Sequence, residues 1–162
     1  MAGKHDSTAP HRCSKCDTVM VERTITRDLP VGDAWFTVTT PAWECPVEGN
    51  FVLGARAWKA LCAEGERLMA MHGPATGGNL RMLRLTMGLG LEELARLTGI
   101  DGVEIDRIER ARKTVPPPLL WATVSALFLD RIDSPMPMRS LLEAANATEV
   151  ERRTLDLRDV AA

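Results

Sequence analysis

Apolar side chains recur with two different spacings along the chain, and the spacing changes near residue 54. Before that point, two stretches rich in β-branched and aromatic residues, around positions 19–25 and 35–39, flank the segment DLPVGD. Such stretches on either side of a turn that contains proline and glycine predict a β-hairpin. From residue 54 to residue 72 the spacing is helical and predicts one helix whose apolar face carries Trp58, Leu61, Cys62, Leu68 and Met69.

The segment HGPATGGN, residues 72–79, then breaks the helical pattern and predicts a short flexible linker that ends with Asn79 as a helix cap. Several short helices are expected after it, up to about Arg131. The first of them carries Leu80, Leu83 and Met87, and the next has Leu94, Ala95 and Leu97 facing inward. Prolines 116–118 precede a further helix with a stripe formed by Leu120, Val124, Leu127 and Phe128. A short helix is also expected from Met138 to Ala145.

The segment LEELARLTGIDGVEIDRIERARKT, residues 91–114, has the pattern of a helix-turn-helix. This motif needs a small residue where its two helices cross, a turn residue without a Cβ atom, and apolar residues that hold the second helix on the first. Asp101 and Glu104 fit a capping box at the start of the second helix. Ala95 is the small residue and Gly99 is the turn residue. The apolar set consists of Ile100, Ile105 and Ile108.

Residues 80–128 resemble the Xre (lambda repressor-like) helix-turn-helix family, with Glu109 at the position of the family's typical acid. Combined with the N-terminal hairpin, the chain is similar to MqsA/YgiT-type antitoxins and related zinc-ribbon regulators. The fold class is therefore expected to be α+β, a small zinc-ribbon-like β-hairpin followed by an all-α Xre-type domain. The predicted segments are a disordered tail (1–10), a zinc-ribbon-like domain (11–53), a helix and linker (54–78), the helix-turn-helix domain (79–131) and a C-terminal extension (132–162).

The resemblance to the Xre family implies which residues contact double-stranded DNA. The residues after the turn and on the outer face of the second helix would contact bases, namely Gly102, Val103, Asp106 and Arg107. Arg107 is the strongest reader, since it can bind guanine through two hydrogen bonds, but it can equally remain solvated and paired with Glu104. The phosphate contacts would come from Arg110, Arg112 and Lys113. Gly90 and Leu91 depart from the family, which often has a capping Ser or Thr and a phosphate-binding Gln there.

The charge of the chain gives no general attraction to nucleic acid. The formal net charge is −2, and residues 76–131 carry eight basic and seven acidic side chains. DNA affinity must therefore come from the local placement of a few arginines. The second helix and its flank, residues 101–113, hold four acids and four bases.

Four cysteines in a chain without a signal-peptide pattern favour a metal site or free thiols over a disulfide framework. Cys13 and Cys16 form a CxxC knuckle before the hairpin, and Cys45 opens a second knuckle after it. Glu48 stands where the resembling families have a fourth cysteine. The predicted Zn²⁺ ligands are thus Cys13, Cys16, Cys45 and Glu48. His11 and Cys62 are alternative fourth ligands, although Cys62 also fits the apolar face of its helix.

No apolar run approaches the roughly 18 residues that span a bilayer, so a cytoplasmic protein without membrane contact is expected. No nucleophile triad, phosphate loop or dinucleotide motif is present, and the chain is not expected to be an enzyme. The sequence favours a sequence-specific DNA-binding transcription regulator that acts as a homodimer on an operator. It could also be an antitoxin whose ribbon binds a toxin or another protein. The alternative is an adaptor that binds protein through a helix-turn-helix with weakened DNA contacts.

Overall fold

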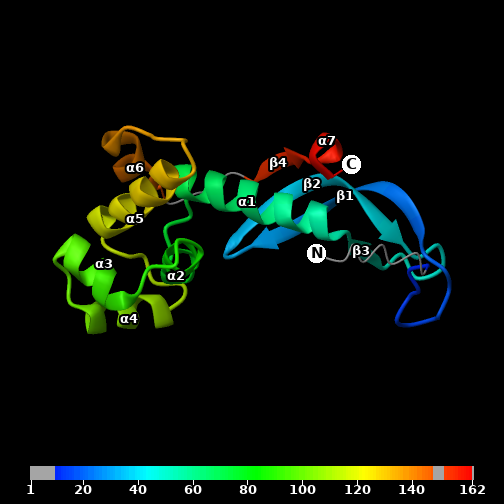
Figure 1. The fold of residues 1–162 in the computed structure, drawn as a ribbon, viewed down its shortest axis with the longest axis horizontal. Coiled ribbons are helices and arrows are strands. Elements are labelled where there is room, and N and C mark those ends of the chain that lie inside the picture. The colour runs from blue at the N-terminus through cyan, green and yellow to red at the C-terminus, as the bar shows by residue number, and fades with distance from the viewer. Residues whose placement is uncertain (1–9, 148–151, 162) are drawn as a thin grey trace, which may run out of the picture.

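The structure is a computed structural model that describes residues 10–147 and 152–161, so residues 1–9 of the predicted tail lie outside it. Its described part is α+β, with an N-terminal sheet and a helical unit (Figure 1). The strands are β1 (Val21–Val31), β2 (Ala34–Glu44), β3 (Phe51–Leu53) and β4 (Arg153–Asp156). The helices are α1 (Ala55–His72), α2 (Gly77–Thr86), α3 (Leu91–Thr98), α4 (Gly102–Arg110), α5 (Pro118–Arg131), α6 (Met138–Ala145) and α7 (Arg158–Ala161).

The predicted β-hairpin is confirmed, but its turn is shorter than expected. β1 and β2 pair antiparallel from Val21 opposite Glu44 to Val31 opposite Ala34, so most of DLPVGD belongs to a strand. The turn consists of Gly32 and Asp33 only. Gly32 has φ of +59°, a left-handed conformation that glycine adopts without a steric cost and that two-residue hairpin turns require.

One face of the sheet packs on α1 through alternate positions of both strands. The pairs Val31–Ala34 and Leu29–Phe36 lie on this face, as period-two alternation requires. On α1 the buried positions include Leu61 and Met69, which confirms part of the predicted stripe. Trp58, by contrast, is 53% exposed and does not belong to the buried face.

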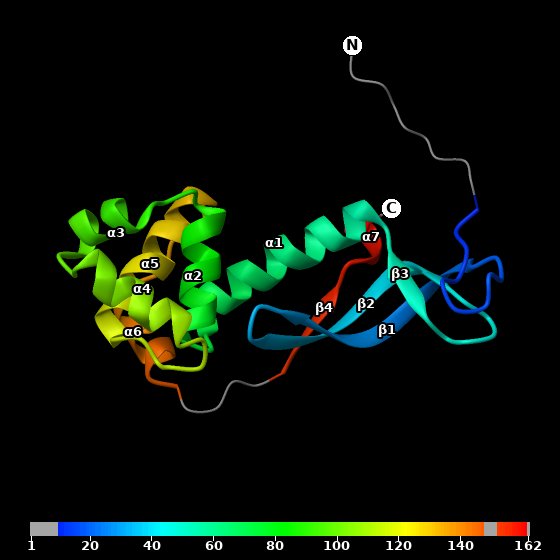
Figure 2. The same ribbon diagram turned by 90° about the horizontal axis from the view of Figure 1, so that it is seen from below.

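A fourth strand joins the sheet and was not expected from the sequence. β4 pairs parallel with β2, with Phe36 opposite Arg153 and Thr39 opposite Asp156. β3 and β4 lie along one edge of β2 and β1 lies along the other. The chain therefore leaves the helical unit after α6 and returns to the sheet, beside α1 (Figure 2).

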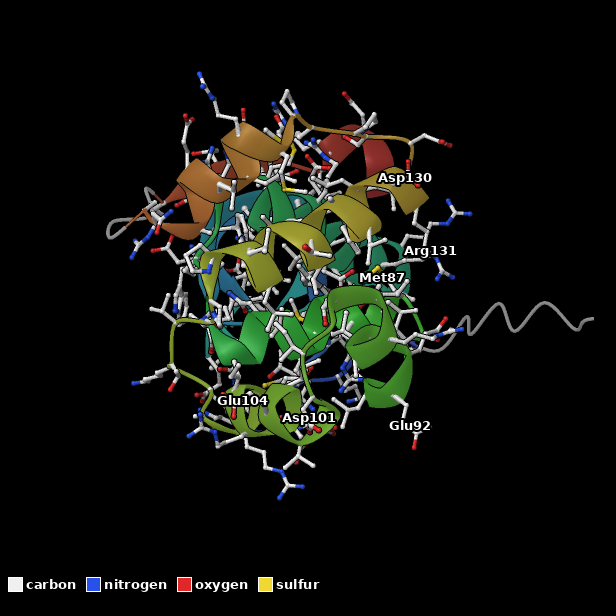
Figure 3. The ribbon with its side chains drawn as sticks, turned by 90° about the vertical axis from the view of Figure 1, so that its left-hand side faces the viewer. Met87, Glu92, Asp101, Glu104, Asp130 and Arg131 are labelled. Carbon is white, nitrogen blue, oxygen red and sulfur yellow. The ribbon has the colours of Figure 1, made fainter. Side chains whose placement is uncertain are left out.

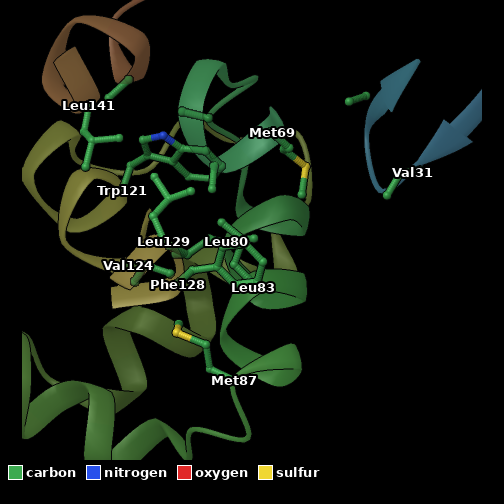
Figure 4. Packing of buried hydrophobic residues seen from close by; sticks show 14 of the residues in the cluster. Val31, Met69, Leu80, Leu83, Met87, Trp121, Val124, Phe128, Leu129 and Leu141 are labelled. Atoms are coloured by element: carbon green, nitrogen blue, oxygen red, sulfur yellow. The ribbon is translucent and has the colours of Figure 1, made fainter. Parts of the chain in front are cut away.

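Helices α2 to α6 form the helical unit and surround an apolar core. Figure 4 shows Leu80 and Leu83 of α2 facing Phe128 and Leu129 of α5, all of them buried. The predicted bounds of the helix at 138–145 are confirmed, and Pro118 is the first residue of α5, a position where proline is well tolerated. Leu97 was expected to face inward but is 51% exposed. Leu94 is the one buried residue of α3.

The segment expected to be a flexible linker is partly helical, because His72 ends α1 and Gly77 begins α2, so only residues 73–76 lie outside the helices. The cap of α2 is Thr76 and not Asn79, because the Thr76 hydroxyl accepts a hydrogen bond from the backbone N–H of Asn79 at 3.1 Å. The buried Asn79 side chain instead accepts from the Asp33 N–H at 2.8 Å. Thr76 also donates to the Asp33 carboxylate at 2.7 Å. The hairpin turn is thus fastened to the start of α2.

A single apolar core runs through the sheet, α1 and the helical unit. It includes Val31 of the hairpin, Met69 of α1, Leu80 of α2 and Leu155 of β4. Figure 4 shows Met69 lying between the hairpin residue Val31 and the leucines of α2. In the described part of the chain, no helix is both long and apolar enough to cross a membrane.

Candidate DNA interface and metal centre

The helix-turn-helix is built by α3, α4 and the turn between them. Gly99 ends α3 with φ of +72°, and its N–H donates to the Ala95 carbonyl at 2.8 Å. Asp101 caps α4 by accepting from the Val103 N–H at 2.7 Å. The second half of the predicted capping box is replaced, because both Glu104 carboxylate oxygens accept from Arg107.

A buried ion pair joins α4 to α2. Arg84 donates through Nε and Nη2 to the two carboxylate oxygens of Glu109, each at 2.7 Å, and both side chains are less than 10% exposed. Arg84 also donates to the Leu89 carbonyl at 2.7 Å, which orders the turn before α3. These hydrogen bonds from the guanidinium to Glu109 raise the pKa of Arg84. Glu109 therefore serves the fold, and its partner Arg84 was not identified from the sequence.

The outer face of α4 presents Val103, which is 79% exposed, and two arginines that already have acidic partners. Arg107 bonds Glu104 at 2.6 and 2.9 Å, and Arg110 pairs with Asp106 at 2.8 Å. The hydrogen bond from Arg107 holds the pKa of Glu104 below its usual value. Before any DNA contact, both charged residues of the predicted base-reading set, Asp106 and Arg107, are therefore paired with a neighbour of opposite charge.

Gly102, the first residue of α4, contributes no side chain to this face. A Cβ atom built there would make ordinary contacts of 3.7 Å or more, so the fold does not require glycine. Beyond α4, Arg112 and Lys113 are exposed and have no ion-pair partner within residues 10–147 and 152–161. They are the predicted phosphate contacts that remain uncompensated.

The start of α3 is acidic. Gly90 caps it without a side-chain hydrogen bond, and Glu92 and Glu93 occupy its first turn, where acids stabilise a helix through its dipole. Figure 3 shows Glu92 on α3, the α4 cap Asp101 and Glu104 on α4 at the same end of the molecule. The charge of the interface is thus divided, with acids around the two helix starts and bases after the end of α4.

Three of the four cysteines converge at the base of the hairpin. The sulfur atoms of Cys13, Cys16 and Cys45 all lie within 4.8 Å of one another, and the Cys16 and Cys45 sulfurs are 3.5 Å apart. Met20 and Trp43 pack against this cluster. Three thiols at this separation could hold a metal ion.

The two knuckles hold their first cysteine in the same way. The Cys13 sulfur accepts hydrogen bonds from the backbone N–H groups two and three residues later, at Lys15 and Cys16. The Cys45 sulfur likewise accepts from Val47 and Glu48, with the Glu48 nitrogen at 3.4 Å. Glu48 therefore occupies the position in its knuckle that Cys16 occupies in the other.

The Glu48 carboxylate itself is exposed and lies outside the group of three sulfurs. The two alternative ligands are also outside it. The ring of His11 packs on Trp43 with centroids 4.7 Å apart, and Cys62 is half-buried on α1.

The knuckle hydrogen bonds change the acidity of the thiols. The backbone N–H groups of Lys15 and Cys16 lower the pKa of Cys13 to about 7, because they stabilise its thiolate. The Glu48 N–H acts in the same sense on Cys45, but burial and the sulfurs of Cys16 and Cys13 oppose it, and the pKa of Cys45 is raised. The lowered pKa of Cys13 suits metal binding, since the thiolate is the ligand form.

Comparison with known proteins places the family resemblance in the second half of the chain. Residues 76–155 match the family described as a helix-turn-helix domain. The match begins at the cap of α2 and ends within β4, so it covers α2 to α6. No curated protein and no solved structure matches the chain.

Proposed function

We propose that the protein is a transcription regulator that binds duplex DNA through α3 and α4. The observation that carries this proposal is the helix-turn-helix itself, in which α4 is anchored by Glu109 and Arg84 and keeps its outer face open. The family match to a helix-turn-helix domain supports it. In this type of domain the second helix enters the major groove.

The residues proposed to read bases are Val103, Asp106 and Arg107. Val103 can contact a thymine methyl group, Asp106 can accept from a cytosine amino group, and Arg107 can bind guanine through two hydrogen bonds. Arg107 must leave Glu104 to do so. That exchange is feasible because the side chain of Arg107 is 75% exposed, and exposed ion pairs contribute little stability.

The residues proposed to contact phosphates are Arg110, Arg112 and Lys113, with the adjacent acids limiting the affinity. Helix-turn-helix proteins commonly bind as dimers to half-sites one helical turn apart, and a homodimer is part of this proposal. Size measurement by light scattering, with and without duplex, tests the dimer.

The metal proposed for the ribbon is zinc, held by Cys13, Cys16 and Cys45 with Glu48 as fourth ligand. The equivalence of the two knuckles supports Glu48, because a tetrahedral ribbon site takes the first and the fourth residue of each knuckle. A zinc ion bound there would crosslink the two ends of the hairpin and stabilise them. Its proposed role is therefore structural.

A second function, a protein-binding adaptor, is favoured by one feature of the interface. Both arginines on the outer face of α4 are paired with acids, and the apolar Val103 beside them is highly exposed. An antitoxin role combines the two, with the ribbon on a toxin and the helix-turn-helix on DNA. Co-purification with the product of a neighbouring gene tests the antitoxin role.

The deciding experiment is selection of bound duplexes from a random pool at low salt. We expect enrichment of a short palindrome by the wild-type protein and a flatter preference for Arg107→Ala, since one two-bond base contact discriminates by about 1–3 kcal/mol. Lys113→Ala, the matched control, should weaken all sequences equally. The absence of any enrichment or mobility shift would reject DNA binding and favour the adaptor.

A further inference from the structure

A hollow beside the helix-turn-helix is bordered by three arginines from two separate segments. Arg81 comes from α2, and Arg110 and Arg112 come from the end of α4 and the loop that follows it. Met82 and Leu85 of α2 also line it. Neither the match to a helix-turn-helix domain nor the sequence pattern singles out Arg81.

The loop that carries Arg112 is fastened to α2 by its backbone. The Gly78 N–H donates to the Arg112 carbonyl at 2.9 Å, and the Gly77 N–H donates to the Thr114 carbonyl at 2.8 Å. This close approach depends on glycine, because a Cβ atom on Gly77 would lie 2.0 Å from the carbonyl oxygen of Ile108. The backbone of Arg112 is therefore held against Gly78, on the same helix as Arg81, before any ligand arrives.

The charge around the hollow is positive. Glu109 lines it, but both of its carboxylate oxygens are taken by Arg84. Asp106 pairs with Arg110. Asp33 near Gly78 keeps its negative charge, because its partner Thr76 is a neutral hydroxyl, but the two arginines Arg81 and Arg112 outweigh it. Arg81 and Arg112, in contrast, have no ion-pair partner in the part of the chain that the structure describes.

We infer that this hollow is a binding site for a phosphate of the DNA backbone, with Arg81 and Arg112 as its ligands. The inference rests on the proposed function and extends the DNA interface from α4 to α2. The hollow is open and is bordered by flexible guanidinium groups, which suits a continuous phosphate chain. Arg81 would then provide a phosphate contact that the acidic start of α3 does not provide. This contact compensates for the capping Ser or Thr and the phosphate-binding Gln that are missing at Gly90 and Leu91.

The test is the salt dependence of affinity for a labelled duplex of about 20 base pairs, measured by fluorescence anisotropy between about 50 and 200 mM KCl. Each phosphate contact contributes about 0.9 to the slope of log affinity against log salt. We therefore expect Arg81→Ala and Arg112→Ala each to reduce the slope by about 0.9. The factor by which the affinity falls between about 50 and 200 mM KCl should then be about 3.5 times smaller in each variant than in the wild-type protein. Arg81→Lys should keep the wild-type slope.

The control is Arg139→Ala on α6, an exposed arginine separated from α4 by α5 (Figures 1 and 3). It removes the same charge away from the proposed site and should leave the slope unchanged. A wild-type slope in Arg81→Ala, while Lys113→Ala lowers it, would overturn this site and leave the proposed function standing. An equal loss in Arg139→Ala would also overturn it, since total charge would then explain the effect. A wild-type protein that binds no duplex would overturn both.

Discussion

Gly77 is the residue on which the position of the loop after α4 depends most directly. A methyl group there would meet the Ile108 carbonyl oxygen at 2.0 Å, and this neighbour is backbone, which cannot rotate away. Gly102 also begins a helix, yet a methyl group there meets nothing closer than 3.7 Å. The two positions form a matched pair.

We expect Gly77→Ala to destabilise the protein by at least about 1–3 kcal/mol, as overpacking does elsewhere. Gly102→Ala should be neutral or stabilising by up to about 1 kcal/mol, since alanine loses less backbone entropy on folding. Urea denaturation of both variants measures the difference. Equal stability of the two would contradict the close packing of α2 on the α4 end.

At the scale of elements, the Arg84–Glu109 pair decides how α4 is held on α2. Both side chains are buried, so the removal of one partner leaves an uncompensated charge in the core. Arg84→Met alone should therefore cost about 3–5 kcal/mol, whereas Arg84→Met combined with Glu109→Leu should recover most of the loss. A double-mutant cycle in urea measures the coupling.

The exposed pair between Glu104 and Arg107 supplies the control for that cycle. Glu104→Gln removes one partner of an ion pair on the same helix, where water can solvate the other. We expect no measurable change in stability. If the buried and the exposed pair cost the same to break, the anchoring role of Glu109 would be wrong.

The two knuckles give a prediction for the metal centre. We expect the purified protein to carry about one zinc ion per chain, and Glu48→Cys to hold it more tightly, because a thiolate replaces a harder ligand. Competition with a chromogenic chelator measures the affinity, and Cys62→Ser, on α1 outside the cluster, is the control. Substoichiometric metal with unchanged folding would reject the site.

At the scale of the whole molecule, the sheet and the helical unit share one core and are joined twice, through the Gly32–Asp33 turn on α2 and through β4 on β2. The sequence predicted a ribbon-like domain and a helix-turn-helix domain on either side of a flexible linker at residues 72–79, where a protease would be expected to cut first. The contacts favour one cooperative unit, because Leu155 at the C-terminal end packs in the same core as Leu80.

Leu155→Ala should accordingly destabilise the helix-turn-helix together with the sheet, by about 2–5 kcal/mol. Amide hydrogen exchange should become faster in α2 and α5 as well as in β2. Leu97→Ala, at an exposed leucine of α3, is the control and should change little. Faster exchange confined to the sheet, or early cleavage at residues 72–79 in limited proteolysis, would restore the two-unit description.

The sequence by itself determined the features that depend on near neighbours in the chain. Helical spacing predicted α1 and α5, the bounds of α6 were those expected, and Gly99 and Asp101 marked the turn and the cap of the helix-turn-helix. These follow from local backbone geometry and from hydrogen bonds within a few residues. The convergence of three cysteines also followed, since a hairpin brings its two ends together.

Only the tertiary structure decided which distant groups meet. The partner of Glu109 is Arg84, 25 residues away, and the partner of Asn79 is the hairpin turn 46 residues away. β4 is too short and too polar to be predicted, and it exists because β2 has an edge free for pairing. Burial likewise depends on which neighbour covers a helix, so Leu97 and Trp58 remain exposed although their spacing matched an apolar face.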